Sequence, residues 1–131
     1  MVIVDTTVWI DYFRGTINPP TEWLDRELDR RRIGLTDLIL CEIRQGVPNE
    51  RQAERTLAAL QKFEIYPLGG IELAVAAARN FRLLRSRGRV VRKLVDSLIA
   101  SFCILNGFTL LHNDRDYDPF EEFLGLKTIR E

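Results

Sequence analysis

Residues 2–11 have the sequence VIVDTTVWID, which combines a strand and the start of a helix. The first three residues are β-branched and apolar, a pattern typical of a short buried strand. Asp5, Thr6 and Thr7 follow at once, and these residue types favour helix N-termini. We therefore expect a strand that leads directly into a helix over residues 7–14.

The same alternation continues along the chain. Further strands are predicted at 33–35, 65–68, 108–111 and 127–129, and helices at 21–31, 37–46, 49–62, 71–86, 92–105 and 119–124. Short apolar strands that alternate with helices predict an α/β fold with a parallel sheet covered on both faces. The 131 residues contain no internal repeat or low-complexity segment, so we expect a single domain over residues 1–131.

The composition excludes several classes of protein. Lys+Arg and Asp+Glu both number 19, which excludes a strongly basic nucleic-acid coat and an acidic tail but not a local basic patch. The first apolar run has no basic segment before it, so a secretory signal is not expected. The apolar stretch 94–111 contains Asp96, which argues against a membrane span. We expect Cys41 and Cys103 to be buried, reduced thiols in a cytoplasmic protein.

Two aspartates directly follow predicted strands. Asp5 comes after residues 2–4, and Asp114 comes shortly after residues 108–111. Binding sites of open parallel sheets lie beyond the carboxyl ends of the strands, so these carboxylates are candidates for one site. Helix capping by Asp5 and turn formation by Asp114 are the alternatives.

Two further carboxylates lie within apolar helices. Asp96 belongs to KLVDSLIASFCIL, residues 93–105, where burial of an unpaired carboxylate would cost several kcal/mol. An ion pair with Arg92 is the alternative for Asp96. Glu42 belongs to LILCEIR, residues 38–44, and a merely exposed glutamate is its alternative.

Carboxylates brought together from these positions would repel one another, and a divalent cation relieves that repulsion. Mg²⁺ and Mn²⁺ prefer oxygen ligands. The chain has one histidine, His112, and no evident pairing of a nucleophile with a base. The residues therefore favour metal-activated water that attacks a phosphodiester.

Four separated motifs resemble those of PIN-domain nucleases of the VapC toxin type. They are VDTTVWID at 4–11, the helix that carries Glu42, VDSLIA at 95–100 and LLHNDRDYD at 110–118. The resemblance covers nearly the whole chain, in the family's order and spacing. It implies a three-layer α/β/α PIN-like fold with a short central parallel sheet, and a metal-dependent endoribonuclease, a hydrolase acting on ester bonds.

The resemblance also implies roles for individual residues. Asp5, Glu42, Asp96 and Asp114 would form an acidic quartet around one or two Mg²⁺ or Mn²⁺ ions, with Asp5, Asp96 and Asp114 as metal ligands. Asp116 would be a fifth acidic catalytic residue, and Thr7 would support the site by hydrogen bonding. The family further implies an RNA substrate, a homodimer and a VapB-like antitoxin. DNA would be contacted only indirectly, through the antitoxin.

A basic segment precedes Asp96. Seven of the 19 Lys+Arg residues lie between Glu72 and Asp96, with no acidic residue among them. We interpret Arg85, Arg89 and Arg92 as candidate RNA-phosphate contacts. A solvated helix face and a surface for an anionic partner are the alternatives.

The aromatic residues Trp9, Tyr12 and Phe13 follow the first aspartate by one helical turn. Core packing or a protein interface accounts for them better than base stacking does. If an antitoxin docks there, these side chains would serve as its anchors.

Two other functions remain open from the residues alone. A non-catalytic PIN-like binding module would be favoured by loss of a quartet carboxylate, yet all the matching positions are acidic. A phosphatase or receiver domain would form an aspartyl-phosphate on Asp5. Such phosphatases have a second aspartate two residues later, where this chain has Thr7.

Overall fold

A computed structural model describes residues 1–129 and contains a parallel sheet of five strands among them. The strands are β1 (Val2–Val4), β2 (Ile33–Thr36), β3 (Glu64–Tyr66), β4 (Thr109–Leu111) and β5 (Lys127–Thr128). Their order in the sheet is β3-β2-β1-β4-β5, and every neighbouring pair is parallel. The chain therefore builds outward from β1 first on one side and then on the other, so β1 and β4 flank a topological switch point.

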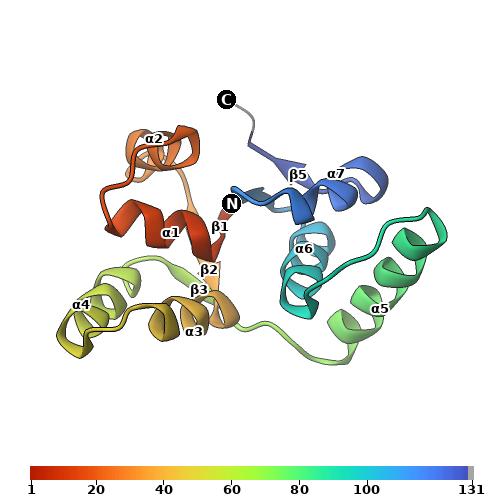
Figure 1. The fold of residues 1–131 in the computed structure, drawn as a ribbon, viewed down its shortest axis with the longest axis horizontal. Coiled ribbons are helices and arrows are strands. Elements are labelled where there is room, and N and C mark those ends of the chain that lie inside the picture. The colour runs from red at the N-terminus through yellow and green to blue at the C-terminus, as the bar shows by residue number, and fades with distance from the viewer. Residues whose placement is uncertain (130–131) are drawn as a thin grey trace.

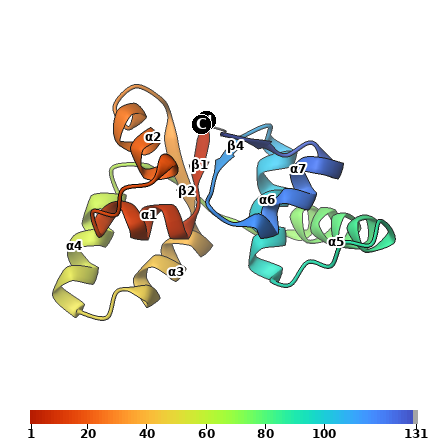
Figure 2. The same cartoon turned by 45° about the horizontal axis from the view of Figure 1, so that its top comes forward.

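Helices cover both faces of the sheet, which confirms the predicted three-layer α/β/α architecture (Figure 1). They are α1 (Thr6–Phe13), α2 (Pro19–Glu27), α3 (Asp37–Gly46), α4 (Glu50–Leu60), α5 (Ile71–Ser86), α6 (Leu94–Asn106) and α7 (Asp118–Leu124), with a 3₁₀ turn, η1 (Arg115–Tyr117), before α7. Helices α1 to α4 lie on one side of the sheet and α5 to α7 on the other, as Figure 2 also shows.

The core is formed where both layers meet the central strands. Ile3, Val4 and Leu110 in the strands are fully buried, as are Trp9 from α1 and Ile99 from α6. Strands that are apolar along their whole length are typical of a parallel sheet with both faces covered. The core thereby fixes β1, β4 and the starts of the segments that follow them.

Several predicted boundaries are corrected by the structure. Helix α2 begins at Pro19, because Asn18 caps it and Thr21 lies at its third position in a capping box. The same helix ends at Glu27, four residues earlier than predicted. Helix α6 begins at Leu94 rather than at residue 92.

One cysteine prediction is also wrong. Cys103 is buried, but Cys41 is exposed, because it lies on the face of α3 away from the sheet. Burial raises the pKa of the Cys103 thiol well above its usual range. No helix in the part of the chain described here is long and apolar enough to cross a membrane.

Candidate metal centre

The predicted acidic residues come from four elements around the switch point. Asp5 directly follows β1, and Asp114 lies in the loop after β4. Strands β1 and β4 pair so that Val4 stands opposite Leu111, and the Asp5 N–H donates to the Leu111 carbonyl oxygen at 3.0 Å. This pairing brings the segments after both strands to the same edge of the sheet.

Three carboxylates gather at this edge. Asp96, Asp114 and Asp116 each place one carboxylate oxygen within 4.8 Å of those of the other two. Asp96 is buried in the first turn of α6. Asp114 caps η1, and its Oδ1 accepts a hydrogen bond from the Asp116 N–H at 2.9 Å. The predicted fifth residue therefore belongs to the tightest group, which we call the acidic cluster.

Asp5 lies beside the acidic cluster and is joined to it by a tyrosine. The Tyr117 hydroxyl donates to Asp5 Oδ1 at 3.1 Å and also contacts Asp96 Oδ1 at 3.4 Å. Tyr117 is fully buried. The sequence analysis missed this residue, although an aromatic side chain inside the polar loop at residues 112–118 was a signal that it packs inward.

Glu42 is held by Thr6, whereas Thr7 was the residue expected to support the site by hydrogen bonding. The Thr6 hydroxyl donates to Glu42 Oε1 at 2.7 Å. Thr7 is exposed on α1 and has no such bond among residues 1–129. Because consecutive helical residues point about 100° apart, Thr6 faces α3 while Thr7 faces solvent.

Burial governs the electrostatics of the site. Burial, with smaller contributions from the charges of Asp96 and Glu42, raises the pKa of Asp5 from 3.8 to about 7, although hydrogen bonds from the Thr6 backbone N–H and the Tyr117 hydroxyl oppose the shift. Burial likewise raises the pKa of Asp96 to about 6, with Lys93 opposing the shift and Asp114 adding to it. The pKa of Tyr117 is raised well above its usual value, so its hydroxyl keeps its proton.

The residues present fit a hard divalent cation. Asp96 Oδ2 is buried and has no hydrogen-bond partner among the described residues. Such a group is costly unless a charge or a donor compensates it. Asp114 and Asp116 lie beside it, and a set of carboxylate oxygens is the ligand set that Mg²⁺ and Mn²⁺ prefer.

The basic segment does not form one continuous helix face. Arg85 lies over the Phe81 ring on α5, at 5.7 Å, and Arg89 forms an ion pair of 2.7 Å with Glu122 of α7. Arg92 is in the loop before α6 and makes no ion pair with Asp96 within residues 1–129. The helix pair considered for Asp96 and Arg92 therefore does not form, since Arg92 precedes the helix.

Residues 2–122 match the PIN domain family. The chain belongs to that family. It is 30% identical over 132 residues to VapC ribonuclease Mb1587 of Mycobacterium bovis and to Ribonuclease VapC11 of Mycobacterium tuberculosis, covering 97% of this chain and 96% of each relative. Among the PIN domains, it therefore belongs with the VapC ribonucleases.

Solved structures with this fold include VapBC2 of Rickettsia felis, bound to a DNA fragment from its promoter, and FitAcB of Neisseria gonorrhoeae. Their TM-scores are 0.79 and 0.76, each at 19% identity. The first match covers 98% of both chains, and the second covers 99% of this PIN domain and 97% of the other chain.

The raised pKa of Asp5 predicts how the stability of the metal-free PIN domain depends on pH. The folded chain holds this proton up to about pH 7, whereas the unfolded chain releases it near pH 4. The free energy of unfolding should therefore fall as pH rises between these values. Asp5→Asn should therefore raise it by roughly 1–3 kcal/mol more at pH 7.5 than at pH 5.

Thermal melts in EDTA at both pH values would measure this effect. Asp29→Asn makes the same chemical change at an exposed carboxylate and should leave both melts unchanged. Equal shifts for Asp5→Asn at pH 5 and pH 7.5 would contradict the assignment.

Proposed function

We propose that this PIN domain is an endoribonuclease that depends on Mg²⁺ or Mn²⁺ and acts as the toxin of a toxin–antitoxin pair. The kinship with VapC ribonucleases supports RNA as the substrate. The observation that carries the metal dependence is the buried, unpartnered Asp96 Oδ2 beside Asp114 and Asp116.

The chain's residues divide into two roles in this proposal. Asp96, Asp114 and Asp116, with Asp5 beside them, would hold the ion. When bound, the ion would stabilise charge on phosphoryl oxygens and lower the pKa of a water. Glu42, which accepts a hydrogen bond from the Thr6 hydroxyl, would orient a water for attack in line with the leaving oxygen.

The chemistry of the product ends tests this mechanism. Attack by water at phosphorus leaves a 5′-phosphate and a 3′-hydroxyl, the ends that the family resemblance implies. RNA from cells after brief induction can be ligated to adaptors that require a 5′-phosphate and then sequenced. New junctions at defined sites are expected. Products that end only in 2′,3′-cyclic phosphates would contradict metal-activated hydrolysis, because they arise from attack by the 2′-hydroxyl.

We further propose that the basic segment holds RNA phosphates close to Asp96. Arg92 and Lys93 directly precede α6, and the charge of Lys93 already acts on Asp96. Arg85 on α5 and Arg89 in the loop after it would extend this path, although Arg89 also pairs with Glu122.

Replacing Arg85, Arg89 and Arg92 by Ala should weaken RNA binding and reduce its salt dependence. Each lost phosphate contact should lower the slope of log K against log salt by about 0.7 for a single strand. Fluorescence anisotropy with the cleavage-deficient Asp96→Asn background would measure both. Arg30→Ala, an exposed arginine on the opposite helical layer, is the control. If the slope is unchanged, these arginines do not contact RNA phosphates, and a solvated helix face explains the basic segment.

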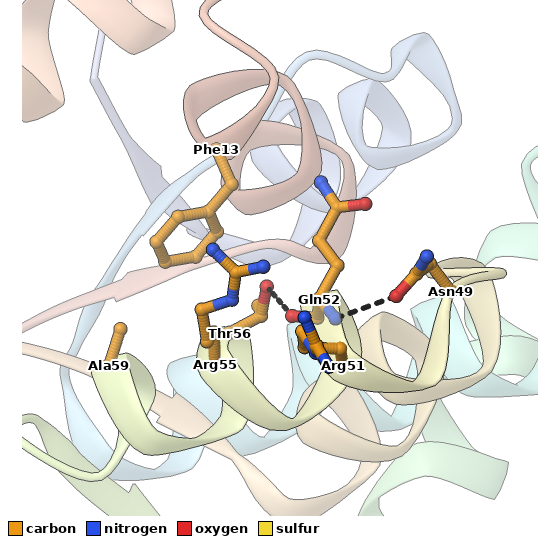
Figure 3. Close-up of a pocket in the computed structure, with 7 residues that line it drawn as sticks. All are labelled: Phe13, Asn49, Arg51, Gln52, Arg55, Thr56 and Ala59. Atoms are coloured by element: carbon orange, nitrogen blue, oxygen red, sulfur yellow. Dashed lines mark hydrogen bonds between the residues drawn. The ribbon is translucent and has the colours of Figure 1, made fainter.

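The groove between α1 and α4 is the surface that we propose for the antitoxin. Two hollows of about 510 and 530 Å³ share Phe13 and Ala59 and so form one groove along these helices. Figure 3 shows Gln52 and Arg55 rising from α4 toward the end of α1 that carries Phe13. The groove shares no residue with the acidic cluster, so an antitoxin that fills it needs a second segment to reach the cluster.

A homodimer is the oligomeric state that we infer. Ile71, Val90 and Leu94 are exposed by 85%, 72% and 73%. Leu94 also lines a largely apolar hollow of about 700 Å³ between α5 and α6, together with Phe81 and Leu98. Exposed apolar patches of this kind mark association surfaces. Sedimentation velocity at micromolar concentration distinguishes a dimer from a monomer. DNA would be contacted through the antitoxin rather than by this chain.

A further inference from the structure

Tyr117 occupies a place in the site that the acidic residues alone do not explain. Its hydroxyl lies between two carboxylates from different elements, Asp5 after β1 and Asp96 in α6. The ring is fully buried, and it packs against His112 with the ring centroids 4.8 Å apart. A hydroxyl can donate only one proton, and the shorter contact, 3.1 Å, is to Asp5.

The contact distinguishes the two oxygens of Asp96. Tyr117 contacts Oδ1, while Oδ2 is the buried oxygen without a partner among residues 1–129. A carboxylate that is held by one oxygen keeps the other in a fixed direction. Without the hydroxyl, repulsion between Asp5 and Asp96 would favour rotation of the two groups away from each other.

The same short turn carries the other members of the cluster. Asp114 caps η1, Asp116 lies within it and Tyr117 ends it. The His112 ring accepts a hydrogen bond from the Asp114 N–H at 3.1 Å through Nδ1 and packs on Tyr117. Placement of the Tyr117 hydroxyl is therefore coupled to placement of Asp114 and Asp116.

We propose that Tyr117 is a positioning residue for the cation site, whose hydroxyl sets the spacing and orientation of Asp5 and Asp96. The inference rests on the proposed function, because it assigns Tyr117 to the same metal site. It predicts that the hydroxyl affects metal affinity more than it affects the fold. The Phe side chain keeps the ring and its packing, so Tyr117→Phe removes the hydroxyl alone.

Mn²⁺ binding provides the direct test. Titration of metal-free protein with Mn²⁺, followed by the electron paramagnetic resonance signal of the free ion, gives the dissociation constant without substrate. Tyr117→Phe should weaken Mn²⁺ binding by about 10–100-fold, the usual effect of removing a partner of a metal ligand. Tyr66→Phe removes a hydroxyl that donates to Glu64 at 3.2 Å, outside the cluster, and should bind Mn²⁺ as the wild type does.

Cleavage kinetics give a second measurement. At limiting Mn²⁺ the kcat of Tyr117→Phe should fall while the KM for RNA stays the same, and raising Mn²⁺ should restore kcat. A variant that had merely lost folded protein would not be rescued in this way. Equal Mn²⁺ affinity in Tyr117→Phe and wild type would overturn the positioning role. Absence of both Mn²⁺ binding and RNA cleavage in the wild type would instead overturn the proposed function.

Discussion

Asp96→Asn is expected to reduce RNA cleavage by about 100-fold or more while the chain stays folded. Asp96 is the buried member of the acidic cluster, and its Oδ2 is the oxygen that lacks a partner among residues 1–129. An amide has the same shape but no charge, so it would no longer balance the positive charge of the ion that stabilises the phosphoryl oxygens. Burial raises the pKa of Asp96 to about 6, so the metal-free variant should melt no lower than the wild type at pH 7.5.

Initial rates of cleavage of a fluorescent single-stranded RNA, measured with saturating Mg²⁺, provide the comparison. Asp29→Asn again serves as the matched control, because it neutralises an exposed aspartate of α2's C-terminal flank. Cleavage by Asp96→Asn within threefold of the wild-type rate would show that the reaction does not depend on this carboxylate.

Inhibition by the antitoxin should depend on a basic side chain placed in the acidic cluster. Asp5, Asp96 and Asp114 have no arginine or lysine bonded to them within residues 1–129, and an inserted guanidinium would replace the charge of the ion. Removing one partner of a buried charge pair costs about 2–5 kcal/mol, which corresponds to a loss of affinity of roughly 30-fold or more. High Mg²⁺ should compete with the same side chain.

The test replaces each arginine and lysine in the toxin-binding segment of the antitoxin by Ala, one at a time. One variant should inhibit at least about 30-fold less well, and Mg²⁺ should relieve inhibition by the wild-type antitoxin but alter that variant little. If every variant inhibits equally at all Mg²⁺ concentrations, inhibition is steric and acts through the groove around Phe13.

Much of the fold was predictable because local patterns agree with the tertiary structure. The apolar run at Val2–Val4 forms β1, and Asp5 directly precedes α1 because helix-capping residue types follow that run. The start of α2 was predicted wrongly. A threonine can serve either as the N-cap or as the third helical residue of a capping box, and Thr21 occupies the second of these places while Asn18 is the N-cap. Sequence alone does not rank two capping residues that lie three positions apart.

The gathering of the acidic residues was predictable from topology, but their supporting contacts were not. Asp5 and Asp114 follow strands that pair, which the alternation of strands and helices already suggests. The choice of Thr6 over Thr7 depends on the rotation of α1 about its axis. Tyr117 contacts Asp5 across 112 residues, and no local pattern specifies such a contact.

Metal dependence is the central claim, and a single titration tests it most directly. Wild-type protein purified in EDTA is mixed with single-stranded RNA, and Mg²⁺ or Mn²⁺ is then added in steps while cleavage is followed on a gel. Asp96→Asn protein purified in parallel controls for contaminating nucleases. We expect no cleavage in excess EDTA and full activity once the divalent cation is restored. Undiminished cleavage by the wild-type protein in excess EDTA, absent from the Asp96→Asn sample, would contradict the account.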